Sequence, residues 1–139
     1  MAIFFFSEDV NPPAINKSKV KSWLKEEIEG KGKKVGDLNM VFCSDEFLLQ
    51  YNKQYLNHDY YTDIITFDYT EGVSVSGDLF ISTERVMENA QLNNKSYEEE
   101  LLRVMIHGVL HILGHGDKGD AESAQMRLEE EKALKRYNK

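Results

Sequence analysis

The sequence predicts an α+β fold of the mixed α/β kind, in which about five helices pack against a small mixed sheet of about four strands. Short stretches rich in β-branched and aromatic residues alternate with longer stretches whose apolar residues recur at helical spacing. Their order is β, α, β, α, β, β and then three helices. The chain has 139 residues and no repeat or linker-like segment, so we expect residues 1–139 to form a single domain.

Each element has its own local signal. AIFFFS and DLNMVFCS are short apolar runs typical of strands, and DIITFDYT and SGDLFIST flank a loop at Gly72 as an antiparallel hairpin would. The predicted strands cover residues 2–7, 37–44, 63–70 and 76–83. The predicted helices lie within 11–34 after a turn, at 45–56, at about 84–93, from 96 to about 113, and from 120 to about 136.

Polar residues mark the predicted helix starts. Ser44, Thr83 and Ser96 each precede a helical stretch and are suited to cap it, and three glutamates follow Ser96 in the first turn, where carboxylates favour the helix dipole. The helix that begins there is apolar on nearly all sides, so we expect it to run through the core. The last helix is amphipathic.

Composition narrows the function classes. The net charge is −7, and residues 38–94 hold only Lys53 and Arg85 against nine acids. Such acidity disfavours nonspecific nucleic-acid binding, and we expect no DNA partner. No apolar run is long enough for a membrane span, the N-terminus does not fit a signal peptide, and the lone Cys43 suits a buried, inert thiol, so we expect a cytoplasmic protein without membrane contact.

The stretch HGVLHILGHGD (107–117) carries the chemistry. His107 and His111 are four residues apart, so a helix places both on one face, where they can bind one ion. His115 would lie about 12 Å along the axis from His107 in a straight helix, too far for the same ion. If Gly114 adopts the left-handed conformation that ends helices, the chain turns back, and either Asp117 or His115 becomes the third ligand.

Two nitrogens and a carboxylate suit Zn²⁺ best, with Ni²⁺ and Mn²⁺ as alternatives. Three protein ligands leave an open position, which is typical of catalytic sites. The alternative is that these histidines are ordinary core residues. We prefer the metal because two imidazoles deep in an apolar helix would cost several kcal/mol without strong partners, on the order of a buried unpaired polar group.

Gly108 separates this motif from that of the metzincin peptidases, which need glutamate directly after the first histidine as general base. Glycine weakens a helix interior, so its presence indicates that something approaches the backbone closely. The sequence identifies no other general base.

With these residues in view, the chain resembles the YbeY family of bacterial endoribonucleases, also called rRNA maturation factors. The segments NKQYLNHDYYTDIITFDY (52–69), GDLFIS (77–82) and above all HGVLHILGHGD carry the resemblance. It implies a metal bound by three ligands of the motif, here His107, His111 and Asp117. It also implies metal-dependent cleavage of single-stranded RNA in rRNA maturation and ribosome quality control, with an rRNA precursor as substrate and the ribosome or its small subunit as candidate partner.

Two positions depart from the family pattern. Asp117 stands where the family has its third histidine, and Leu56 stands where it has an arginine. For the missing arginine, His58 or Arg85 are candidate substitutes for contacting phosphate. His115 and Asp78 are further candidates, Asp78 for orienting a metal ligand.

Four aromatic residues near the motif segments are candidates for stacking on unpaired bases. We expect Tyr55 and Phe67 to belong to the core, whereas Tyr60 and Tyr61 could be either core or stacking residues.

Two other functions remain as alternatives to a zinc-dependent endoribonuclease. One is a metzincin-like metallopeptidase, and the other is a non-enzymatic ribosome-associated factor with a structural zinc.

Overall fold

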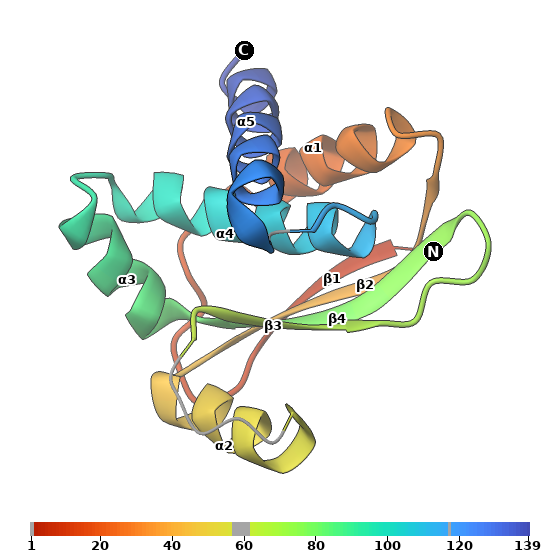
Figure 1. Ribbon diagram of the computed structural model, residues 1–139. Helices are drawn as coiled ribbons and strands as arrows, with labels where there is room; N and C mark the ends of the chain where they lie inside the picture. The colour runs from red at the N-terminus through yellow and green to blue at the C-terminus, as the bar shows by residue number, and fades with distance from the viewer. Residues whose placement is uncertain (1, 57–61, 117) are drawn as a thin grey trace.

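The computed structural model describes residues 2–56, 62–116 and 118–139 (Figure 1). The described residues form four strands and five helices, as the sequence predicts. In chain order they are β1 (Ala2–Ser7), α1 (Lys17–Glu29), β2 (Lys34–Cys43), α2 (Asp45–Leu56), β3 (Ile64–Asp68), β4 (Ser74–Ser82), α3 (Thr83–Leu92), α4 (Tyr97–Ile112) and α5 (Gly119–Tyr137). None of these helices combines the length and the apolar character needed to cross a bilayer.

The four strands form one mixed sheet in the order β1-β2-β4-β3. β1 pairs in parallel with β2, and β2 pairs in parallel with β4. β3 and β4 pair antiparallel, which confirms the predicted hairpin. Parallel neighbours need a crossover connection, and α1 supplies the one between β1 and β2.

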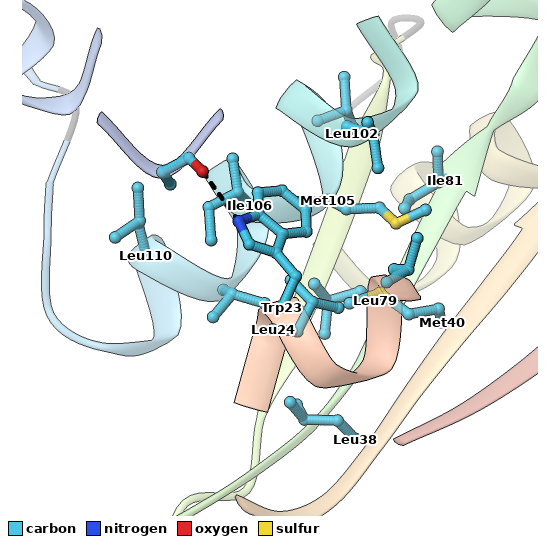
Figure 2. Close-up of a cluster of buried hydrophobic side chains, with 14 of the residues drawn as sticks. Trp23, Leu24, Leu38, Met40, Leu79, Ile81, Leu102, Met105, Ile106 and Leu110 are labelled. Carbon is cyan, nitrogen blue, oxygen red and sulfur yellow. Dashed lines mark hydrogen bonds between the residues drawn. The ribbon is translucent and has the colours of Figure 1, made fainter. Parts of the chain in front are cut away.

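Helices cover the two faces of the sheet unequally. α1, α4 and α5 lie on one side and α2 lies on the other (Figure 1). The main core fills the space under the first group, where Trp23 and Leu24 of α1 meet the apolar side chains of β4 and α4 (Figure 2). The indole Nε1 of Trp23 donates a hydrogen bond to the carbonyl oxygen of Ala133 at 2.8 Å, which fixes α1 to α5.

A smaller core lies between the sheet and α2. Its buried members are Val41, Cys43, Leu48, Ile65 and Phe80. Burial raises the pKa of the Cys43 thiol to about 12, in agreement with the predicted inert thiol. Phe67 packs against this cluster as expected, but the core assignment of Tyr55 is wrong, because its side chain is 56% exposed and only borders the rings of Tyr51 and Phe67.

Two of the three predicted caps are present. The Ser44 hydroxyl accepts a hydrogen bond from the backbone of Phe47, and Ser96 forms a capping box with Glu99. The third prediction is wrong by one residue. Ser82, whose backbone is extended, caps α3, and Thr83 is already helical.

α4 is the core helix that the sequence predicts, and Gly108 is its point of closest approach to the sheet. A Cβ atom at position 108 would lie 2.5 Å from Cδ2 of Leu79 and 2.7 Å from Cδ1 of Ile64. The close approach predicted from this glycine is therefore made by side chains of β4 and β3. Gly108 lets α4 lie directly on the strands.

Replacing Gly108 with alanine should lower the free energy of unfolding by about 1 kcal/mol, because overpacking costs ~1–3 kcal/mol and outweighs the ~1 kcal/mol gain in helix propensity. Urea unfolding of the purified variant measures this change. The reverse exchange Ala124→Gly, at an exposed position of α5, calibrates the propensity contribution alone. A Gly108→Ala protein more stable than the wild type would contradict the packing argument.

Candidate metal centre

The chain turns away from the helix axis where α4 ends, as the sequence predicts. Gly114 has φ +105°, a conformation that favours glycine. The backbone N–H of Gly114 donates to the carbonyl oxygen of His111 at 3.1 Å, and that of His115 donates to the carbonyl oxygen of Leu110 at 3.0 Å. These two bonds form a Schellman motif, which satisfies the last carbonyls of the helix. The turn directs the chain after His115 off the axis of α4.

His107 and His111 are one helical turn apart on α4. The expectation that both imidazoles are deeply buried is wrong. The side chain of His107 is 25% exposed, and His111 is exposed, because this stripe of α4 faces away from the main core. Burial cost therefore no longer argues for a metal at His111. An accessible pair is instead what a substrate-binding metal site requires.

A buried carboxylate of α5 fixes the orientation of His107. Oε2 of Glu130 lies 2.6 Å from Nδ1 of His107, and the Glu130 side chain is only 3% exposed. Because a carboxylate in this position accepts, Nδ1 carries the proton, and a metal would be bound through Nε2. A carboxylate behind a metal-binding histidine sets the ring orientation and makes it a stronger ligand.

Arg103 joins Glu130 to a second buried carboxylate. Its guanidinium donates to Oε1 of Glu130 at 3.1 Å and to both carboxylate oxygens of Glu100. These hydrogen bonds raise the pKa of Arg103 above its ordinary value. The side chain of Glu100 is 2% exposed, so this arginine supplies the positive charge that two buried acids require.

Sequence reasoning missed Glu130, Glu100 and Arg103. A signal for Glu130 was nevertheless present. The buried positions of α5 are Met126, Glu130, Ala133 and Tyr137, so the glutamate interrupts an otherwise apolar stripe. A charged residue on the buried side of a helix needs a partner, and here the partners come from α4.

Asp63 is a further acid near this network. Burial raises the pKa of its carboxyl group, and the charges of Arg103 and His107 oppose that rise. It directly precedes β3, whose Ile64 side chain approaches Gly108 of α4. Acids with shifted pKa values are concentrated at functional sites, so Asp63 is counted with the candidate site.

The other residues singled out in the sequence are dispersed. Asp78 lies on the sheet face opposite α4, since its neighbour Leu79 points toward Gly108, and it accepts a hydrogen bond from Nδ2 of Asn39 at 2.8 Å. Arg85 pairs with Asp45 and Glu88, joining α3 to the start of α2. Leu56 is the last residue of α2.

The remaining candidates lie partly outside the described residues. Asp117, His58, Tyr60 and Tyr61 belong to the segments that the structure does not describe. Among the residues it does describe, no three histidines, cysteines or acids gather closely enough to hold a metal ion. The donors that are described fit such an ion, because His107 and His111 share a helix face and a carboxylate fixes the first of them.

A cavity of about 270 Å³ opens beside His107. Its lining comes from α4 and α5 and consists of Arg103, His107, Ser123, Met126, Arg127 and Glu130. The hollow therefore combines a candidate ligand with two arginines, the side chains best suited to contact phosphate oxygens.

Known proteins resemble this chain in sequence and in fold. The model of the family described as Endoribonuclease YbeY matches residues 6–138. Two proteins named Endoribonuclease YbeY are similar to this chain over 134 residues. The one from Parabacteroides distasonis is 54% identical to the chain, and the one from Bacteroides fragilis is 50% identical. The alignments cover 96% of this chain in both cases, with 94% of the first relative and 96% of the second. A Thermotoga maritima protein of known solution structure matches with a TM-score of 0.69 and 27% identity, over 97% of this chain and 88% of that one.

Replacing Glu130 with glutamine should weaken metal binding by about 10- to 100-fold, because the carboxylate that orients His107 is lost. Titration of the metal-free protein with Zn²⁺, in competition with a chelator of known affinity, measures the change. Glu98→Gln, which removes an exposed carboxylate at the start of α4, is the control and should keep the wild-type affinity. Equal affinities for Glu130→Gln and wild type would contradict the orienting role.

Proposed function

The chain belongs to the family of Endoribonuclease YbeY, and on that premise we propose that it is a metal-dependent endoribonuclease that cleaves single-stranded RNA in rRNA maturation and ribosome quality control. One observation of this structure carries the proposal furthest. The first histidine of the helical pair is bonded to a buried glutamate on a second helix, beside a cavity with two arginines. A histidine so fixed is suited to hold a metal, and arginines beside it are suited to a phosphodiester.

His107, His111 and Asp117 are the proposed ligands of one divalent ion, with Zn²⁺ as the preferred metal. When bound, such an ion lowers the pKa of a water molecule and withdraws charge from a phosphoryl oxygen. The oxygen of Asp117 in place of an imidazole nitrogen leaves the site less cationic. His115, whose backbone takes part in the turn after Gly114, is the alternative third donor.

The protein's own residues have distinct roles in this proposal. Glu130 holds the ring of His107 in one tautomer and one orientation, and Arg103 holds Glu130. The glycines act through the backbone. Gly108 keeps α4 against the strands, and Gly114 turns the chain off the axis of α4. Together they place the ligands before substrate arrives, which lowers the cost of reaching the reactive geometry.

Peptide hydrolysis is not favoured, because Gly108 occupies the position of the peptidase glutamate and is buried against Leu79 and Ile64. No carboxylate can act from that position. A purely structural zinc is also less favoured, because His111 is exposed while structural ions are normally enclosed by their ligands.

The cellular setting follows from the substrate. We place the chain in the cytoplasm, as one domain spanning residues 1–139, with the ribosome or its small subunit as the partner that presents the rRNA precursor. Association with purified small subunits tests this part separately from cleavage.

His111→Ala and His107→Ala should each abolish metal binding and RNA cleavage, since two remaining ligands do not hold the ion. The assay incubates wild type and variants with labelled single-stranded and duplex RNA, with and without a chelator, and metal content is measured on the same samples. Gln91→Ala, at an exposed position of α3, is the control and should keep full activity.

Two outcomes would contradict the proposal, and one would invalidate the cleavage assay. Full metal occupancy in both histidine variants would refute the ligand assignment. Cleavage that ignores both chelation and substitution would point to a contaminating nuclease. Digestion of a peptide substrate by the wild type, lost in His111→Ala, would favour the peptidase alternative.

A further inference from the structure

The cavity beside His107 continues into a second one along α4 and α5. This second cavity has a volume of about 450 Å³, and both are lined by Arg103, Arg127 and Glu130. It extends to Asn93 and Lys95 at the turn between α3 and α4. α4 rises about 15 Å from Tyr97 to His107 at 1.5 Å per residue, so the two hollows make a groove that leads away from the proposed metal ligands.

The positively charged side chains that line this groove differ in whether they form ion pairs. Arg103 is held by Glu100 and Glu130, and its charge is matched by theirs. Arg127 is exposed and, within the described part of the chain, forms no ion pair. It lies where the two hollows meet. Lys95 is likewise exposed at the far end, and Glu131 is the one exposed acid in the lining.

Arg127 is thus an arginine at a groove junction that forms no ion pair with any described acid. An exposed guanidinium in a hollow that also holds a histidine is suited to an anionic ligand with oxygen acceptors, and its planar fork matches phosphate. The length of the groove and the second cation at its far end fit a chain of phosphates better than a single small anion.

We infer that the α4–α5 groove binds the backbone of the single-stranded RNA substrate, with Arg127 contacting a phosphate next to the cleavage site and Lys95 contacting one further along. This inference rests on the proposed function and adds the path of the substrate. Arg127 is assigned a binding role, which is separable from the metal.

The test measures binding without cleavage. A fluorescently labelled single-stranded RNA oligonucleotide is titrated with the full chain at several NaCl concentrations, in the presence of a chelator so that the RNA is not cut. Each phosphate contact contributes about 0.7 to the slope of log K against log salt for a single strand. Arg127→Gln should therefore lower the magnitude of the slope by about 0.7, and Arg127→Lys should restore it.

Lys135→Gln is the matched control, since it removes one exposed positive charge from the same helix outside the groove. It should keep the wild-type slope. Arg127→Gln should also raise KM for a cleavable RNA by a larger factor than it lowers kcat, with unchanged Zn²⁺ content. The thermal unfolding midpoint checks that both variants fold.

An unchanged slope for Arg127→Gln would overturn the inference, as would an equal loss in Lys135→Gln, which would reveal only a general charge effect. Failure of the proposed function looks different. In that case the wild type does not cut unmodified single-stranded RNA under any metal condition, whatever the binding slopes are.

Discussion

The contact between Glu130 and His107 is the interaction on which the candidate site depends. It is a polar link between α4 and α5, and breaking it would leave a buried carboxylate with too few partners. Arg103 compensates the negative charge of the buried carboxylates, because its guanidinium donates hydrogen bonds to both Glu130 and Glu100. The same side chains that stabilise the packing of α5 on α4 therefore decide which nitrogen of His107 faces outward. Stability and ligand geometry are properties of one network.

Two glycines place that network relative to the rest of the molecule. Gly108 allows α4 to lie on β3 and β4 without a side chain between them, so the histidine stripe is held at a fixed height above the sheet. Gly114 ends the helix with a positive φ and turns the chain off the helix axis. Other residues pay a steric penalty of roughly 1–2 kcal/mol in left-handed conformations. The motif thus combines the histidines proposed as ligands with glycines that place their helix, and neither type alone would define the proposed site.

Much of the fold was predictable because it depends on local patterns. The hairpin around Gly72, the capping box at Ser96 and the core position of α4 each follow from residues close together in the sequence. The predictions failed where tertiary packing decides. Tyr55 has helical spacing but lies at the rim of the smaller core, and His111 lies on the side of α4 that faces away from the main core. The partnership of Glu130 with His107 joins residues 23 positions apart, and no local pattern specifies it.

An acidic protein repels an RNA substrate wherever its negative charges lie close to the bound RNA, so those charges must lie away from the path of the RNA. The acids between residues 38 and 94 include those of α2 and of the β3–β4 hairpin, and α2 lies on the sheet face opposite α4 and α5. The segment 17–33, which forms α1 and the turn after it, instead carries six lysines against three glutamates. At physiological salt the Debye length is about 8 Å, so charges across the sheet are largely screened at the groove. A phosphate in the groove therefore meets mainly the charges of the groove lining, where Arg127 forms no ion pair within the described residues, and the net charge of −7 does not prevent binding there.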